Sequence, residues 1–226
     1  MNHSVPRSAP TALALLDQDA ELQAAARALT ETGWWLGRGA VADELVAALF
    51  KELEDLREAD QLEHAGIGRE HNHQIDRAIR RDRIHWMSRQ RPVQARFLNR
   101  MEALRLGLNR ELFLGLFEFE GHFAHYPPGG FYRRHFDSFR GAANRIVSTV
   151  TYLNRQWQPG DGGELVIHPA EPGTEAIVIE PRAGDMVLFL SEEIEHEVLP
   201  ARTDRTSIAG WFRLNNSLAG QVDPPR

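Results

Sequence analysis

Residues 145–190 read RIVSTVTYLNRQWQPGDGGELVIHPAEPGTEAIVIEPRAGDMVLFL. Four short runs rich in β-branched residues alternate here with turns rich in Gly, Pro, Asn and Asp, a pattern typical of consecutive strands. Similar runs continue on both sides. The expected strands are 117–126, 132–137, 145–153, 163–169, 175–181, 185–190, 196–201 and 206–214. Eight strands without intervening helices favour a double-stranded β-helix, a double sheet of the jelly-roll or cupin-like kind.

The first half of the chain carries helical signals instead. Residues 12–30 are rich in Ala, Leu, Glu and Gln, and residues 92–112 begin at a proline that suits a first helical turn. Residues 41–59 carry an apolar stripe at three- and four-residue steps, formed by Val41, Leu45, Leu49, Leu53 and Leu56. We therefore expect a mainly β fold with supporting N-terminal helices.

The length and composition suit one domain. The chain has 226 residues, of which 42% are hydrophobic, enough for one sizeable core. We expect a flexible N-terminus at 1–10 and a single domain over 11–226, with helical support in 11–114 and the β core in about 115–215. Residues 61–90 are polar and basic, and predict a long loop or flexible hairpin that ends in a strand-like run at 83–87.

The charge balance and residue usage count against several classes of function. The net charge is -6 and the sequence pI is near 5.9, so there is no global basic field to attract nucleic acid or anionic lipid. The apolar run Ala12–Leu16 is too short for a signal or membrane segment, so we expect a cytoplasmic location. There is no cysteine, so any metal site must use His, Asp and Glu.

A candidate metal site lies in the β half. His135 and Asp137 are two residues apart on one expected strand, so their side chains share a face roughly 7 Å apart along it. His196, at the start of a later strand, could complete a triad of two histidines and one carboxylate. That donor set suits non-haem iron(II) and leaves positions open for other ligands. The competing interpretation is a chance pair with structural histidines.

An arginine strengthens the iron interpretation. Arg205 follows His196 by nine residues and opens the last expected strand. Arginine stays charged and binds a carboxylate bidentately, so an arginine deep beside an iron site fits 2-oxoglutarate. Arg202 competes for this role, but it falls in an expected turn that would point to solvent.

Several stretches together resemble one known family. They are YPPGGFYRRHFD (126–137), TVTYLN (149–154), GDGGEL (160–165), EPRAGDMVLF (180–189) and HEVLPARTDRTSIAGWF (196–212). They resemble the catalytic domain of the prolyl 4-hydroxylases, above all the oxygen-sensing type and its bacterial relatives. The resemblance is strong over about 115–215, and AIRRDRIHWM (78–87) is similar to the segment before the core in that subgroup.

The resemblance implies a role for each site residue. It makes His135, Asp137 and His196 the iron ligands, and it retains Asp137, which excludes the halogenase variant of such sites. Arg205 and the Tyr152 hydroxyl would bind the distal carboxylate of 2-oxoglutarate. The remaining assignments are Tyr126 beside the cosubstrate and Tyr132 and Trp211 beside the substrate. Tyr126, Tyr132 and Trp211 could equally be packing residues, whereas for Tyr152 the contact with the carboxylate is favoured over the alternative of an ordinary core aromatic residue.

The resemblance also implies a reaction. Fe(2+), with 2-oxoglutarate and O2 as cosubstrates and L-ascorbate as an auxiliary reductant, would hydroxylate C4 of a prolyl residue in a protein substrate and release succinate and CO2. Residues 61–90 would close over that substrate. Three alternatives stay open: the same chemistry on a free amino acid, oxidative demethylation of nucleic acid, and a non-enzymatic cupin-like binding module.

The other histidines and the basic run have plainer interpretations. His71 and His73 are expected to be solvated loop residues, and His122, His125 and His168 structural ones. The run RAIRRDR (77–83) could contact an acidic partner or simply form a solvated loop.

Overall fold

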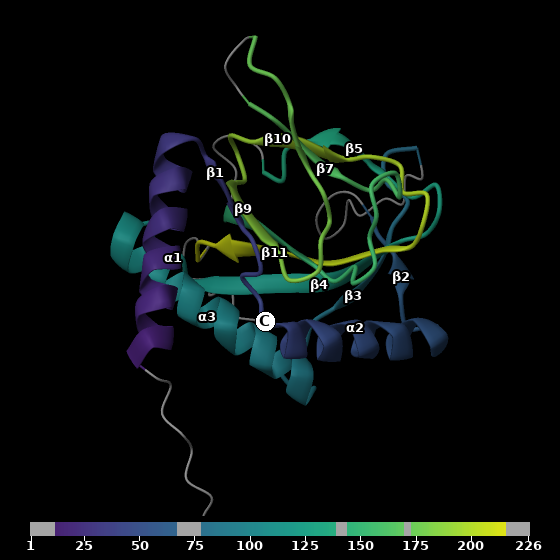
Figure 1. Cartoon of the computed structure of the whole chain (residues 1–226), viewed down its shortest axis with the longest axis horizontal. Coiled ribbons are helices and arrows are strands. Elements are labelled where there is room, and N and C mark those ends of the chain that lie inside the picture. Colours follow the sequence, from purple (N-terminus) through teal and green to yellow (C-terminus); the bar gives the residue numbers. More distant parts are fainter. Residues whose placement is uncertain (1–11, 67–77, 139–143, 170–172, 216–226) are drawn as a thin grey trace, which may run out of the picture.

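The computed structural model describes residues 12–66, 78–138, 144–169 and 173–215 (Figure 1). The helices within this part are α1 (Ala12–Glu31), α2 (Asp43–Glu58) and α3 (Pro92–Leu112). The strands that precede the expected core are β1 (Trp34–Gly37), β2 (Glu63–His64) and β3 (Arg83–Trp86). The strands of the core are β4 (Glu118–Tyr126), β5 (Tyr132–His135), β6 (Arg145–Tyr152), β7 (Leu165–His168), β8 (Ile177–Ile179), β9 (Met186–Leu190), β10 (Glu195–Val198) and β11 (Arg205–Arg213).

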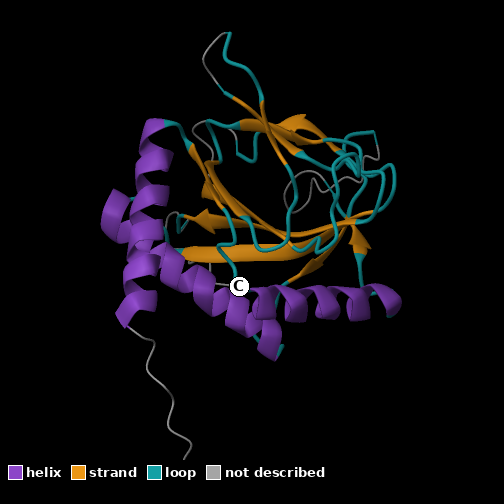
Figure 2. Cartoon of the chain, in the orientation of Figure 1, coloured by secondary structure: helices purple, strands orange, loops and turns teal. Residues whose placement is uncertain are grey.

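The described strands form two antiparallel sheets. The larger sheet has the order β1-β9-β6-β11-β4-β3-β2, and the smaller one has the order β5-β10-β7-β8. In Figure 2 the helices lie against one side of the larger sheet, and the smaller sheet lies on its other side. This confirms the expected mainly β double sheet with helical support.

The helices bury the outer face of the larger sheet. The expected stripe of α2 is buried, and Leu49 and Leu53 are 0% exposed. They belong to one core with Phe123, Ile208 and Phe212 of the larger sheet. Burying a leucine side chain completely contributes about 1.5–3 kcal/mol, so this layer supplies much of the folding energy.

A second core fills the space between the two sheets. Because side chains alternate along a strand, the neighbours of the outward residues point inward. Tyr126, Tyr152 and Phe189 of the larger sheet therefore share this core with Ile167 and Val198 of the smaller one. The candidate site is built in this inner layer.

The structure differs from the sequence-based expectations in three places. The expected strand 132–137 was too long, because β5 ends at His135 and Asp137 lies in the bend that follows. The short strand β1, which pairs with β9, was not expected. The expected loop 61–90 contains the two-residue strand β2, paired with β3, although 67–77 lie outside the described residues.

Some expectations fall outside what the structure describes. The N-terminus at 1–10 and the residues His71, His73 and Arg77 are among these, and the single-domain boundaries stay a prediction. None of the helices in the described residues combines the length and the apolar character needed to cross a membrane.

Candidate metal centre

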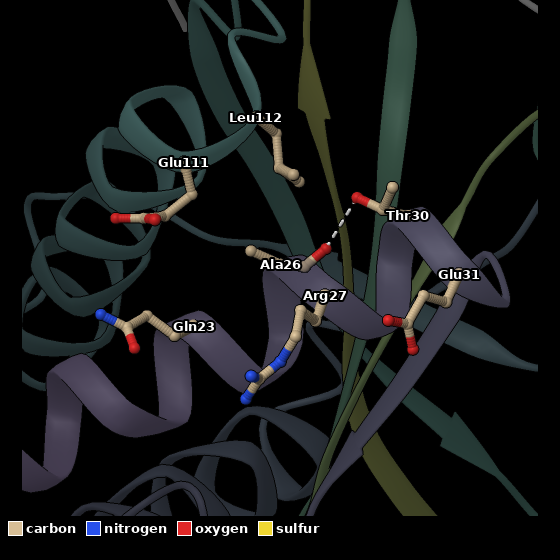
Figure 3. A pocket seen from close by; sticks show the side chains of 7 residues that line it. All are labelled: Gln23, Ala26, Arg27, Thr30, Glu31, Glu111 and Leu112. Carbon is tan, nitrogen blue, oxygen red and sulfur yellow. Dashed lines mark hydrogen bonds between the residues drawn. The ribbon is translucent and has the colours of Figure 1, made fainter.

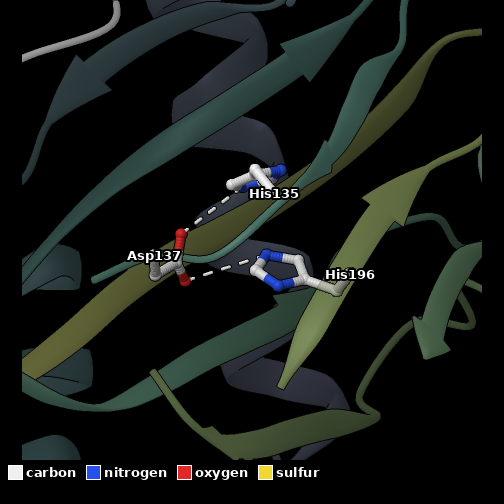
Figure 4. Close-up of side chains that lie close together, drawn as sticks. All are labelled: His135, Asp137 and His196. Atoms are coloured by element: carbon white, nitrogen blue, oxygen red, sulfur yellow. Dashed lines mark ion pairs between the residues drawn. The ribbon is translucent and has the colours of Figure 1, made fainter. Parts of the chain in front are cut away.

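The three candidate ligands meet between the two sheets, at the end of β5. His196 on β10 is paired directly with His135 on β5, and their rings are 4.3 Å apart. Asp137 reaches the same point from the bend after β5. One nitrogen or oxygen atom of each residue lies within 4.8 Å of the others (Figure 4). Among the described residues this is the one such cluster of His, Asp and Glu.

An irregularity in β5 aims His135 at the centre. The β5–β10 pairing joins His196 to His135 and Val198 to Tyr132, so three steps on β5 match two on β10. The extra residue is a β-bulge, which changes the face that the next side chain occupies. As a result Tyr132 and His135 both point inward, with their rings stacked 3.6 Å apart.

Backbone contacts set which nitrogen each histidine offers. The Nδ1 of His135 lies 2.6 Å from the Arg133 carbonyl oxygen, and the Nδ1 of His196 lies 3.2 Å from the Ile194 carbonyl oxygen. A carbonyl only accepts, so each Nδ1 is the protonated donor, and in the neutral tautomer with this proton Nε2 keeps its lone pair. The His135 Nε2 is buried and has no hydrogen-bond partner in the described part of the chain. It is free to bind a metal.

Asp137 is held as a carboxylate. Burial alone would raise its pKa, but the His196 ring, the His135 ring and the Ser148 hydroxyl together lower it well below the usual range. Its Oδ1 lies 3.5 Å from the His135 Nε2, and its Oδ2 lies 3.8 Å from the His196 Nε2. Two neutral imidazole nitrogens and one carboxylate oxygen, close together and directed at one point, fit an iron(II) ion that keeps open positions.

Arg205 lies on the same inner face, at the first residue of β11. It is 2% exposed, and it donates from Nε to the Gly163 carbonyl (2.8 Å) and from Nη1 to the Ser207 hydroxyl (2.8 Å). Its guanidinium carbon is 4.8 Å from the centre of the Tyr126 ring and 5.3 Å from that of the Tyr152 ring. The rival candidate, Arg202, is exposed.

The tyrosines around Arg205 are buried. Burial raises the pKa of Tyr126 and of Tyr152 above the ordinary value, so both keep their protons. The Tyr152 hydroxyl has no hydrogen-bond partner within the described residues. A buried hydroxyl without a partner is costly, and a ligand carboxylate beside Arg205 would satisfy it. This hydroxyl and Arg205 lie close together, so they are candidates to bind one carboxylate.

Trp211 and Tyr132 are the two residues expected to contact the substrate, and both have a cationic neighbour. Trp211 is paired with Ser148 across β11 and β6, and the Arg145 guanidinium lies 3.6 Å from its ring centre. The Arg80 guanidinium lies 4.4 Å from the Tyr132 ring centre, and burial raises the pKa of Tyr132 to about 12.

Sequence reasoning missed several residues behind this site. Ser148 donates to Asp137, Arg145 lies over Trp211, and Arg80 is bound to Asp82 beneath Tyr132. Arg80 belongs to the basic run that was expected to meet an acidic partner or solvent. The alternation of β6 could have shown that Ser148 points inward, whereas the position of Arg80 depends on a long-range contact.

The other histidines have structural contacts. His122 lies between Trp86 and Trp211, with ring centres 5.1 and 5.5 Å away. His125 contacts Asp204, and His168 contacts Glu197, each at 2.9 Å.

A hollow of about 380 Å³ between α1 and α3 is separate from these residues. Figure 3 shows its lining, which includes Thr30, and none of the candidate ligands belongs to it. The Thr30 hydroxyl already donates to the Ala26 carbonyl at 3.0 Å. This polar group is satisfied within α1, so the hollow offers little reason to assign a site.

Comparison with known proteins agrees with this geometry. The sequence model of the 2OG-Fe(II) oxygenase superfamily matches residues 121–213, which include the triad and Arg205. A Pseudomonas putida prolyl-4-hydroxylase of known crystal structure is 42% identical to this chain in sequence. The two structures have a TM-score of 0.79, and the match covers 85% of this chain and 98% of that chain. The chain belongs to the prolyl 4-hydroxylase family. It is therefore an iron(II)- and 2-oxoglutarate-dependent dioxygenase, and O2 is the other cosubstrate.

Two other proteins share the fold or part of the sequence at lower identity. A Trichoplax adhaerens prolyl hydroxylase, solved with a hypoxia inducible factor peptide, has a TM-score of 0.81 at 22% identity over 90% of this chain and 94% of that chain. Human Egl nine homolog 1 is 32% identical over 144 residues, which are 59% of this chain and 33% of the relative. The matches cover between 10% and 33% of the length of this relative and of the similar proteins from rat, mouse and Caenorhabditis elegans.

Proposed function

We propose that this dioxygenase hydroxylates C4 of prolyl residues in a protein substrate and converts 2-oxoglutarate to succinate and CO2. One observation carries the proposal: two neutral histidines and a carboxylate converge within 4.8 Å in the same inner layer as a buried arginine. The 42% identity to a bacterial prolyl-4-hydroxylase supports prolyl residues as the target.

His135, Asp137 and His196 would hold the iron through two Nε2 atoms and a carboxylate oxygen. The bound iron and 2-oxoglutarate together supply the oxidising chemistry. The protein itself would bind the iron and 2-oxoglutarate and orient them. The protonated Nδ1 atoms of the two histidines bind backbone carbonyls and fix the rings, so each Nε2 would be available to hold the iron.

Arg205 and Tyr152 would bind the distal carboxylate of 2-oxoglutarate, with Tyr126 alongside. Arg205 stays charged and its Nε and Nη1 are held by the chain, which fixes the plane of the guanidinium. The protonated Tyr152 hydroxyl can donate to the same carboxylate. These contacts would orient the other end of the cosubstrate toward the triad.

Tyr132 and Trp211 would line the space for the target proline. Both are aromatic and both face the inner layer beside the triad, where they can exclude water and position an apolar ring. Closure of 61–90 over the substrate, L-ascorbate as an auxiliary reductant and a cytoplasmic location also belong to this proposal.

The proposal is tested by pairing cosubstrate turnover with product analysis. The purified protein is mixed with Fe(2+), 2-oxoglutarate and a proline-containing peptide library, and succinate is measured together with the mass of one added oxygen on proline. Asp137→Ala should lose both signals. Asp55→Ala, which removes an exposed carboxylate on α2, should keep both.

Three other results would overturn the metal assignment or favour an alternative function. Succinate formation unchanged in Asp137→Ala would overturn the metal assignment. Oxidation of free proline but of no peptide would favour a small-molecule oxygenase, and no 2-oxoglutarate turnover under any condition would favour a binding module.

A further inference from the structure

Two buried serine hydroxyls form a chain of hydrogen bonds that ends at Asp137. The Ser148 Oγ lies 2.6 Å from the Asp137 Oδ2 and 2.8 Å from the Ser191 Oγ. Ser148 is 1% exposed and Ser191 is 0% exposed. Solvent therefore has almost no access to this chain, and its geometry is set by the protein.

The direction of the two hydrogen bonds follows from the groups themselves. An ionised carboxylate only accepts, so Ser148 must donate its single hydroxyl proton to Asp137. Ser148 then has only lone pairs to offer to Ser191, and Ser191 must be the donor. The chain of donation runs from Ser191 through Ser148 to Asp137.

The two serines stand on the larger sheet, while Asp137 stands on a bend. Ser148 is in β6, where it is paired with Trp211 on β11 and with Phe189 on β9. Ser191 directly follows β9, and its backbone N–H donates to the Ile146 carbonyl at 3.0 Å. A carboxylate on a bend gains a fixed rotation when a rigid element binds one of its oxygens.

We propose that Ser148 and Ser191 are positioning residues that set the carboxylate of Asp137 for the metal. Their chain fixes the rotation of the carboxylate and occupies a lone pair of Oδ2. Oδ1 is left without a hydrogen bond from Ser148, so Asp137 binds through one oxygen and keeps a coordination position open. This inference rests on the metal site of the proposed function.

The probe is Co(2+) added to metal-free protein, followed by its visible absorption. Ser148→Ala should weaken Co(2+) binding about 10- to 100-fold, the usual effect of losing a hydrogen bond to a metal ligand. It should also change the absorption bands, because the freed carboxylate can bind through both oxygens. Ser148→Thr keeps the hydroxyl and should restore most of the affinity.

Ser191 provides the sharper test, because it acts only through Ser148. Ser191→Ala should weaken binding by a smaller factor than Ser148→Ala. The double variant should bind no more weakly than Ser148→Ala alone, since coupled residues are not additive. Ser138→Ala is the matched control: this neighbour of Asp137 is buried, and its hydroxyl has no partner in the described residues. It should bind Co(2+) as the unaltered protein does.

Asp137→Ala separates this inference from the proposed function. If Asp137→Ala keeps the unaltered affinity, the metal site and this inference both fail. If it loses affinity while Ser148→Ala does not, or if the two serine substitutions are additive, only the positioning role fails. Melting of the metal-free variants reports folding, and if Ser148→Ala does not fold, unchanged binding in Ser191→Ala overturns the inference.

Discussion

Arg205 is a permanently charged side chain that is almost completely buried. It is held by hydrogen bonds to Gly163 and Ser207 and lies over the Tyr152 ring. We predict that Arg205→Ala raises the apparent KM for 2-oxoglutarate by roughly 10- to 150-fold, because a charge-assisted hydrogen bond contributes about 1.5–3 kcal/mol. The requirement for Fe(2+) should change far less. Succinate production at varied 2-oxoglutarate and at varied Fe(2+) measures the two requirements. Substitution of the exposed Arg202 by Ala is the control. Equal increases for both would indicate a general loss of structure.

Gly163 determines where Arg205 can lie. Its φ is +76°, and a Cβ added there would lie 2.9 Å from the Arg205 Cδ, closer than real Cβ atoms approach. We predict that Gly163→Ala displaces Arg205 and raises the KM for 2-oxoglutarate.

Gly160→Ala is the matched control for Gly163→Ala. Gly160 also has a positive φ of +100°, but an added Cβ would meet no atom within 4 Å. Both variants should lose about 1 kcal/mol or more of stability from backbone strain, measured by urea unfolding. Only Gly163→Ala should change the KM, and a similar change in Gly160→Ala would show that strain alone is responsible.

At the scale of elements, the segment before β3 lies along β5 and contains a buried ion pair. Arg80 and Asp82 are joined by two hydrogen bonds of 2.8 and 2.6 Å, and the Asp82 side chain is 0% exposed. Backbone bonds link Arg81 to Phe131 and Arg133 to Ile79, so the segment lies along β5 like another strand. Figure 1 shows the nearby strands β2 and β3 at the edge of the larger sheet.

We predict that Arg80→Met destabilises the protein by about 3–5 kcal/mol, because it leaves the Asp82 carboxylate buried without its partner. Arg80→Met combined with Asp82→Asn should recover much of that loss. Urea unfolding of the metal-free protein measures both. Equal destabilisation with and without Asp82→Asn would show that the ion pair is not the cause.

At the scale of the whole molecule, buried histidines make folding sensitive to acid. Burial, together with the positive charge of Arg80, lowers the pKa of His122 from 6.5 to about 4. The unfolded chain therefore takes up a proton near pH 6.5, while the folded chain stays neutral until about pH 4. Stability contributed by His122 is complete above pH 6.5 and is lost as the pH falls toward 4.

We predict that His122→Gln flattens the dependence of the unfolding free energy on pH between 6.5 and 4, by on the order of 3 kcal/mol at the acid end. Burial also lowers the pKa of His196 to about 4, so part of the pH dependence should remain in His122→Gln. Urea unfolding with a chelator across this range makes the measurement, with the exposed His64→Gln as control. A slope unchanged by His122→Gln would contradict the prediction.

Local pattern in the sequence predicted the elements, the candidate triad and Arg205, whereas the roles of the four aromatic site residues came from the family resemblance. Runs of β-branched and aromatic residues between turns rich in Gly, Pro, Asn and Asp placed β4 to β11 within a few residues, and the spacing of leucines placed α2. Both signals are local, since each involves only residues close together in the sequence. The pairing of His135 with Asp137, and the choice of Arg205 over Arg202 as the arginine at the site, also followed from short-range spacing.

Only the tertiary structure decided which of these residues meet, and how. The bulge that turns His135 inward depends on the register between β5 and β10, and His196 follows His135 by 61 positions. Packing of the two sheets sets that register, and neither local propensity nor residue spacing predicts it. The same holds for Ser191 behind Ser148, and for Arg80 beneath Tyr132. The physical reason is that side-chain alternation is local, whereas strand pairing joins segments whose contacts form only when the two sheets close over a common core.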